Sequence, residues 1–229
     1  MQVLLEKTAV LVDLGFFENE FRRENQRPPT PEETLRFPRW ALDGILHDTN
    51  LFRIYFYDGS PLDKEITNPI SGAKTTVMDA ESRRKYHDAI AGSQKSLLRL
   101  GRLAYYKRWF IKEKVQDRII RGQATLPLAP DDIQPATQQK AVDMLIGMDI
   151  VALAIKQTVK NVMILTGDTD LVPAMTFARN EGCAVGLIAT TKGISTGPLA
   201  SDCDHVTVCS ARLPWTYEGQ VEHQRESGT

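Results

Sequence analysis

Short apolar runs alternate along this chain with longer segments in which apolar residues recur at helical spacing. Runs of 4–8 residues rich in β-branched side chains are typical of buried strands, and apolar positions three and four apart are typical of helices. Strands are predicted at 8–12 (TAVLV), 51–61, 102–110, 161–166 (NVMILT), 184–190 and near 205–209 (HVTVC). Helices are predicted at 79–100, 142–157, 171–182 and near 197–203. Strands that alternate with helices predict a parallel sheet covered on both faces.

Four segments break this alternation. Residues 22–38 are polar and proline-rich, which predicts a loop, with a helix beginning near Pro38. The segment 111–122 is amphipathic and fits a helix or part of a strand, and 122–137 reads as a loop rich in Pro, Asp and Gln. Beyond Ser210 the chain is polar. We therefore expect one domain over 1–210, with insertions near 22–38 and 60–137, and a polar tail over 211–229.

Composition narrows the class of protein. The 229 residues have a net charge of −1, so any affinity for nucleic acid must come from a local patch. The three cysteines form no CxxC pair and are odd in number, which argues against a zinc site or a disulfide framework. The N-terminus lacks the features of a signal peptide, and no run of about 18 apolar residues occurs. These features predict a cytoplasmic protein with no membrane partner.

Carboxylates lie at the C-terminal ends of three of the apolar runs. Asp13 comes after TAVLV, Asp58 after IYFY and Asp168 after MILT. In parallel α/β sheets, ligands bind beyond the carboxyl ends of the strands. Asp170, and Asp143 at the start of an apolar helix, could join Asp13 and Asp168 in one cluster. Such a cluster needs a hard cation to neutralise it, and a carboxylate-bound Mg²⁺ or Mn²⁺ can activate water and brace a scissile phosphate.

Each acid also has a simpler interpretation when it is taken alone. Asp168 sits where an Asp commonly caps a helix. Asp13 could close a turn, and Asp143 could complement the positive end of its helix. The functional hypothesis therefore rests on the four acids being together.

Positive charge gathers between Arg83 and Arg121. This segment holds twelve basic and three acidic residues, a local charge of +9. Tyr105, Tyr106, Trp109 and Phe110 are interleaved with it and could stack on bases. The alternative is a solvated charged face over an ordinary aromatic core. On the first interpretation, the residues expected to bind nucleic acid include Arg84, Lys107, Arg108 and Lys112.

The loop TTKGISTGPLAS follows the strand at 184–190. Its Lys192 could also contact phosphate, and Ser195 could support a metal-bound water, although a plain turn before a capped helix explains the loop equally. The four histidines show no ligand spacing, and neither GxGxxG nor a Walker loop occurs.

Four stretches in order carry a resemblance to a known family: TAVLVDLGFF, YFYDGSPLDK followed by NPISG, QKAVDMLIGMDIVALA, and LTGDTDLVPAMTFARNEG. The chain resembles an NYN domain of the LabA-like group, within the PIN-like nuclease superfamily, over roughly residues 8–208. The resemblance implies a PIN-like three-layer α/β/α fold with a central, mainly parallel sheet. It also implies a divalent-metal-dependent ribonuclease.

The family's metal-binding and catalytic acids fall on Asp13, Asp143, Asp168 and Asp170, with Mg²⁺ or Mn²⁺ as cofactor. Asp149 lies six residues beyond Asp143, about 600° of helical rotation, so we expect it to support the site from outside. Two departures from the family's motifs are Phe16, where many members have Asn, and Ala141, where Gly is usual.

The resemblance leaves two further functions open. One is a catalytically weak or inactive nucleic-acid-binding or regulatory module, and the other is a phosphatase of another α/β class. For the nuclease, the expected partners are single-stranded or structured RNA and a second copy of the chain in a homodimer.

Overall fold

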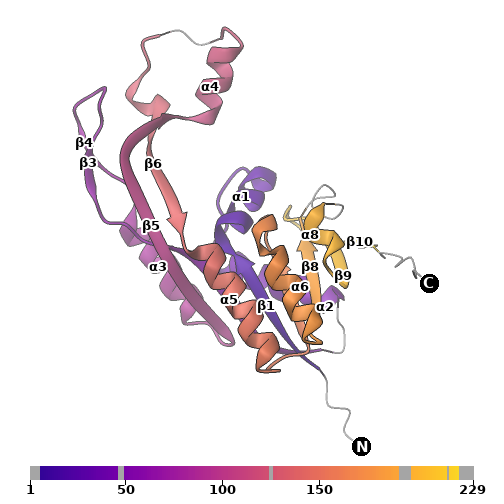
Figure 1. Cartoon of the computed structure of the whole chain (residues 1–229). Helices are drawn as coiled ribbons and strands as arrows, with labels where there is room; N and C mark the ends of the chain where they lie inside the picture. The colour runs from indigo at the N-terminus through magenta and orange to yellow at the C-terminus, as the bar shows by residue number, and fades with distance from the viewer. Residues whose placement is uncertain (1–5, 46–48, 124–125, 191–196, 216, 222–229) are drawn as a thin grey trace, which may run out of the picture.

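A computed structural model describes residues 6–45, 49–123, 126–190, 197–215 and 217–221. Its centre is an eight-stranded sheet in the order β10-β9-β8-β7-β1-β2-β5-β6 (Figure 1). The strands are β1 (Lys7–Asp13), β2 (Asn50–Ser60), β5 (Ser96–Ile111), β6 (Ile133–Lys140), β7 (Asn161–Leu165), β8 (Ala184–Ala189), β9 (His205–Cys209) and β10 (Tyr217–Val221). A separate hairpin is formed by β3 (Glu65–Thr67) and β4 (Lys74–Thr76).

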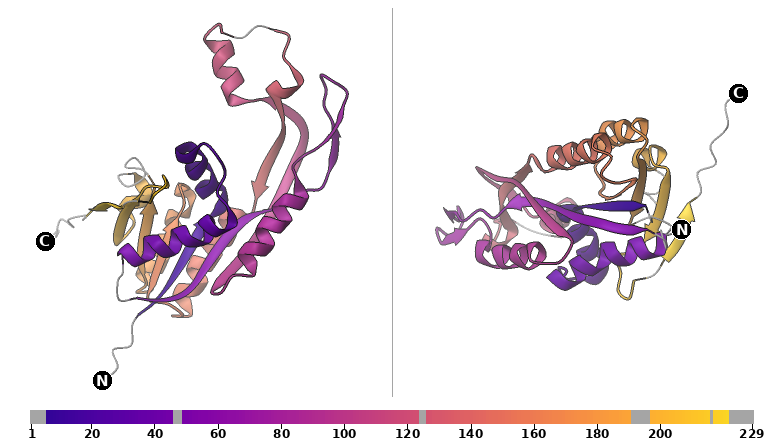
Figure 2. Two further views of the ribbon diagram at one scale, coloured as in Figure 1. Left: turned by 180° about the vertical axis from the view of Figure 1, so that it is seen from behind. Right: turned by 90° about the horizontal axis from the view of Figure 1, so that it is seen from below.

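The sheet is parallel except at its edges, where β6 and β10 each run antiparallel to their neighbour. Helices cover both faces (Figure 2). The described helices are α1 (Leu14–Asn25), α2 (Pro31–Ile45), α3 (Ala80–Ala91), α4 (Glu113–Ile120), α5 (Val142–Ile155), α6 (Val172–Asn180) and α8 (Pro198–Ser201), with single 3₁₀ turns η1 (Pro130–Asp132) and η2 (Thr169–Leu171).

Strand β1 shows why the sheet lies in the middle layer. Its side chains alternate between the two faces. Ala9 and Leu11 pack in a core with residues of α5 and α6, whereas Val10 and Val12 pack in a second core with residues of α1 and α2. Both sets are fully buried, which explains the continuous apolar run in the sequence. The predicted three-layer α/β/α class is confirmed.

The loop predicted over residues 22–38 is wrong over most of its length. Helix α1 continues to Asn25, and α2 already begins at Pro31. Thr30 and Glu33 explain this start, because each side chain accepts a hydrogen bond from the other residue's backbone N–H, at 3.2 and 2.8 Å. Pro38, expected at the start of the helix, lies inside it.

Residues 211–215 and 217–221 are part of the fold, although the sequence predicts a polar tail there. Ala211 is fully buried, and the Trp215 ring packs on Phe37 and Trp40 of α2, with centroids 5.5 and 5.6 Å apart. Residues of β10 then pair with β9 and close that edge of the sheet.

An arm projects from the sheet. Strand β5 pairs with β2 only as far as Arg102, and then continues for nine residues that pair with β6 alone. We call residues 103–140 the arm, which also carries α4. Nine extended residues span roughly 30 Å. Because β5 is parallel to β2, the arm rises beyond the carboxyl edge of the sheet (Figure 1). The loop predicted over 122–137 is wrong from Ile133, where β6 begins.

The three cysteines are buried and free. In the part of the chain that the structure describes, every helix is too short or too polar to cross a membrane.

Candidate active site

Asp13 is the last residue of β1 and the cap of α1. Its Oδ1 accepts a hydrogen bond from the backbone N–H of Phe16 at 3.0 Å. Burial, followed by repulsion from Asp143 and Asp58, raises the pKa of Asp13 to about 6 despite that hydrogen bond. This carboxylate is thus held partly out of water and close to other acids.

The other three predicted acids meet at the same edge. Asp168 caps the 3₁₀ turn η2, and its Oδ1 accepts from the backbone N–H of Asp170 at 2.9 Å. Asp143 lies in the first turn of α5. Burial and the charges of Asp168 and Asp170 raise its pKa. The structure therefore brings all four acids within electrostatic range, and it also gives Asp13 and Asp168 the capping roles that each could have alone.

The donor set fits a hard divalent cation, because it offers carboxylate oxygens whose mutual repulsion a cation would relieve. Within the described residues, however, no three Asp, Glu, His or Cys side chains lie close enough together to hold one ion. Burial is the largest cause of the raised pKa of both Asp13 and Asp143, and repulsion from neighbouring acids adds to it.

Both departures from the family's motifs lie beside these acids. The ring of Phe16 packs directly on Gly167, where a Cβ atom would lie 2.7 Å from the ring. Only glycine leaves room for that ring. Ala141, immediately before α5, has φ of 66°, a left-handed conformation that favours glycine.

Asp58, expected just beyond an apolar run, lies inside β2, which continues to Ser60. Its partners were not foreseen. It is 1% exposed and accepts hydrogen bonds from Arg83 Nε at 2.8 Å and from Gln139 Nε2 at 2.8 Å. His87 Nε2 lies 2.6 Å from its Oδ2. Burial opposes ionisation, but the His87 hydrogen bond and the charge of Arg83 together hold the pKa of Asp58 below its usual range.

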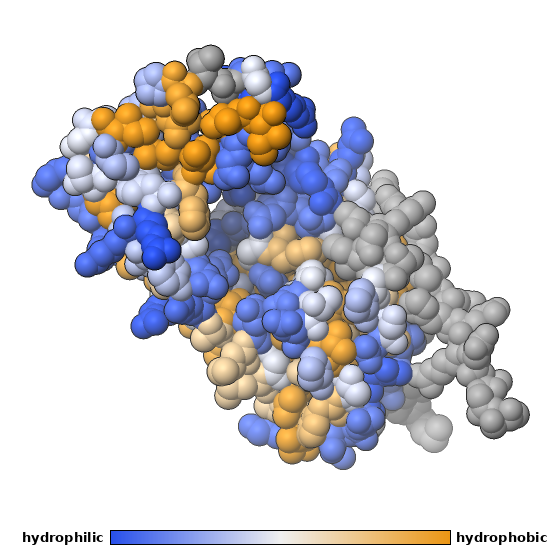
Figure 3. All heavy atoms as spheres, turned by 45° about the horizontal axis from the view of Figure 1, so that its top comes forward, coloured by the Kyte–Doolittle hydropathy of each residue, from blue (hydrophilic) through white to orange (hydrophobic). Residues whose placement is uncertain are grey.

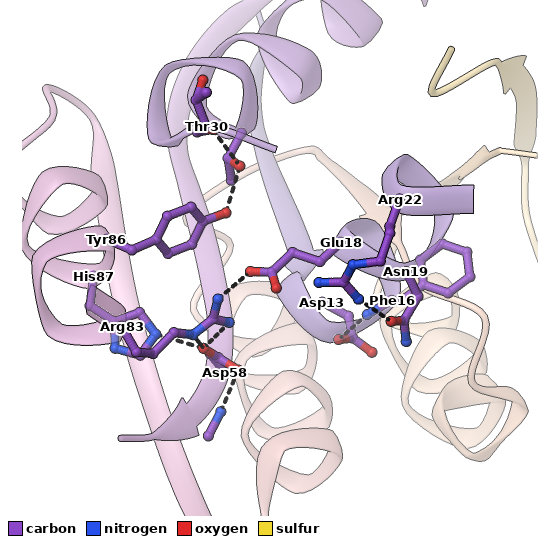
Figure 4. Close-up of polar contacts among 12 residues, drawn as sticks. Asp13, Phe16, Glu18, Asn19, Arg22, Thr30, Asp58, Arg83, Tyr86 and His87 are labelled. Atoms are coloured by element: carbon purple, nitrogen blue, oxygen red, sulfur yellow. Dashed lines mark hydrogen bonds and ion pairs between the residues drawn. The ribbon is translucent and has the colours of Figure 1, made fainter. Parts of the chain in front are cut away.

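Arg83 links this buried group to α1. Its guanidinium also donates to Glu18 at 2.6 Å, so it lies between two carboxylates (Figure 4). Arg83 and His87 are four residues apart on α3, and residues at that spacing share one helix face. That spacing was the one sequence signal that could have paired them with a strand-end acid.

Asp149 points to a different set of residues. Its carboxylate accepts from the Tyr57 hydroxyl at 2.8 Å and forms an ion pair with Arg99 at 3.1 Å. These contacts lie between α5 and the sheet. That Asp149 supports the four acids remains a prediction.

The predicted nucleic-acid contacts divide between the arm and its base. Lys107 and Arg108 are exposed where β5 bulges against β6, and Lys107 has φ of 56°. Lys112 is exposed just before α4, and Arg84 is exposed on α3, 3.4 Å from Asp63. Lys192 and Ser195 lie outside the described residues.

The aromatic residues of the arm are not all core residues. Tyr106 and Phe110 are 44% and 56% exposed, whereas Tyr105 and Trp109 are half-buried. The bulge breaks the alternation of β5, so that Tyr106, Lys107 and Arg108 are exposed in succession.

The Asp13 pKa predicts how stability depends on pH in the metal-free protein. An acid whose pKa is raised on folding stabilises the fold below its unfolded pKa, and this contribution is lost as pH rises through about 6. Asp13→Asn removes the buried charge and keeps a capping side chain. The variant's unfolding free energy should exceed that of the wild type by an amount that grows between about pH 4.5 and about pH 8, to at most about 3 kcal/mol.

Urea denaturation in EDTA at several pH values measures this difference. The lowered pKa of Asp58 makes its own contribution to stability depend on pH in the opposite direction. Asp58 is present in both proteins, so this contribution cancels in the difference. A difference that does not change with pH would show that the Asp13 pKa is ordinary.

The fold and the site together define an α/β protein that presents acids at the carboxyl edge of its sheet, beside a projecting basic arm. The sequence model of the NYN domain matches residues 84–211, more than half of the chain. The chain therefore belongs to the NYN domain family of the PIN-like superfamily, whose members are generally nucleases that use divalent metals. The matched range contains Asp143, Asp168 and Asp170, and Asp13 precedes it.

Two other comparisons add little to this assignment. No match was found among the curated proteins. The crystal structure of a protein of unknown function from Vibrio parahaemolyticus is similar over 90% of this chain and 94% of that one, with 14% identity and a TM-score of 0.48.

Proposed function

We propose that this protein is a divalent-metal-dependent ribonuclease of the LabA-like group. The observation that carries the proposal is the electrostatic coupling of Asp13, Asp143, Asp168 and Asp170 at one edge of the sheet. Membership of the NYN family supports hydrolysis of phosphodiester bonds. The basic arm, which rises from the same edge, supports a nucleic acid as the substrate.

In this proposal the four aspartates hold Mg²⁺ or Mn²⁺. The ion, when bound, supplies Lewis-acid stabilisation of phosphate charge and lowers the pKa of water. The backbone N–H groups of Phe16 and Asp170 each donate to one carboxylate, of Asp13 and of Asp168, and so hold these two side chains at the edge. Lys107, Arg108 and Lys112 hold the phosphates of the bound strand, and Tyr106 and Phe110 stack on its bases.

Metal removal tests the proposal. Purified protein is incubated with single- and double-stranded RNA and DNA in Mn²⁺, in Mg²⁺ and in EDTA. RNA cleavage is expected in either metal and should disappear in EDTA. Cleavage that is undiminished in EDTA would contradict the mechanism, and cleavage of DNA alone would contradict the substrate.

A catalytically silent RNA-binding module is the second candidate. The packing of Phe16 on Gly167 favours it, because an aromatic ring replaces a metal-seeking amide next to Asp13. This candidate predicts RNA binding and stabilisation by Mn²⁺ without turnover. Phe16→Asn should then increase that stabilisation, whereas a ribonuclease should already be active with Phe16.

A further inference from the structure

Helix α5 is apolar on all sides, although only one side is covered. Val142, Ile146, Ile150 and Leu153 are buried against the sheet. On the opposite side, Met144, Met148 and Ile155 are 68%, 58% and 57% exposed. A helix that is apolar all round is typical of a buried position, and contiguous exposed apolar surface on a soluble domain marks an interaction site.

The exposed side of α5 forms one wall of a groove of about 850 Å³. Helix α6 forms the other wall, with Phe177 37% exposed. Hydrophobic side chains gather over these two helices, as they also do on the arm (Figure 3). Small residues, including Gly147 and Ala174, line the groove. A Cβ atom at Gly147 would lie 3.7 Å from Ala174, so these two residues let α5 and α6 pack closely at the floor of the groove.

Charge is distributed unequally along the groove. Asp143 and Asp170 line one end, and Lys156 lines the other. Lys156, which caps α5, is thirteen positions beyond Asp143, or roughly 20 Å along the helix. The surface is therefore complementary to a second copy of itself turned end for end.

We propose that the α5–α6 groove is the interface of a two-fold symmetric homodimer. In an antiparallel arrangement, the Met144 and Met148 stripes of the two copies pack on each other across the two-fold axis. The Lys156 end of one groove then meets the Asp143 and Asp170 end of the other. Each copy thereby places its Lys156 beside the acidic edge of its partner.

The oligomeric state tests the proposal. Light scattering after size-exclusion chromatography at micromolar concentration should give twice the 25.7 kDa of one chain. Met148→Glu should raise the dimer dissociation constant by at least about 30-fold, because it buries an unpaired charge at the centre of the interface. Lys156→Glu should raise it several-fold and should reverse the effect of salt at this contact, because acids would then face acids.

Ile120→Glu is the matched control. Ile120 is 81% exposed on α4 of the arm, so the same apolar-to-acid change should leave the dimer intact. Circular dichroism establishes that each variant is folded. A wild-type monomer, or a dimer that Met148→Glu does not weaken, would overturn the proposal. If the wild-type protein is a monomer and Met148→Glu lowers its affinity for RNA, the groove binds nucleic acid and not a second copy. None of these measurements depends on cleavage.

Discussion

Asp168→Asn is expected to lower the rate of RNA cleavage by at least about 100-fold, since loss of even a group that supports a metal ligand lowers activity by about 10- to 100-fold. The amide has the same shape as the carboxylate and can still accept the Asp170 N–H, so the turn after β7 should stay intact. Removing one negative charge also relieves the repulsion that raises the pKa of Asp143. The variant should therefore be at least as stable as the wild type and bind RNA at least as tightly.

Three measurements separate these effects: cleavage rates in Mn²⁺, RNA affinity in EDTA, and thermal unfolding. Asp131→Asn, at an exposed acid of η1, is the control and should cleave at the wild-type rate. Full activity of Asp168→Asn would exclude Asp168 as a metal ligand. A large loss of stability would instead mean that its capping role dominates.

Asp58→Ala should give the largest loss of stability. The buried carboxylate is the shared partner of Arg83 and His87. Without it, Arg83 keeps only Glu18, and His87 Nε2 loses the carboxylate it contacts. Breaking a buried ion pair by removing one partner costs about 3–5 kcal/mol. For a domain of this size, that corresponds to a fall in Tm of roughly 6–20 °C.

Asp63→Ala is the matched control. Asp63 pairs at 3.4 Å with Arg84 of α3, the helix that also carries Arg83, but both residues of this pair are exposed. An exposed pair contributes about 0–1 kcal/mol. Chemical denaturation of both variants gives the comparison. If Asp58→Ala loses no more stability than Asp63→Ala, the buried network does not stabilise the fold.

The sequence predicts the centre of the sheet better than its edges, for a physical reason. Strands β1, β7 and β8 are buried on both faces, so their apolar runs are almost continuous. Strand β6, IQPATQQK, is mostly exposed, and its polar sequence has no alternation to read. It forms because β5 offers a partner, which is a non-local cause.

The acidic edge shows the same limit at the level of single residues. The rule that ligands lie at the carboxyl ends of parallel strands places Asp13, Asp58 and Asp168 together without any structure. It does not distinguish an acid that faces other acids from one that is neutralised. Asp58 is neutralised because α3 brings Arg83 and His87 to it, and that contact depends on how α3 packs.

The junction between the arm and α5 is one residue long. Strand β6 ends at Lys140, Ala141 adopts its left-handed conformation, and α5 begins at Val142. Gly101 of β5 lies so close that a Cβ atom there would be 2.5 Å from the Lys140 carbonyl oxygen. The pairing of β6 with β5 and the start of α5 are thus joined without any intervening loop. The place of Asp143 at the acidic edge is therefore fixed by the same few residues that anchor the base of the arm.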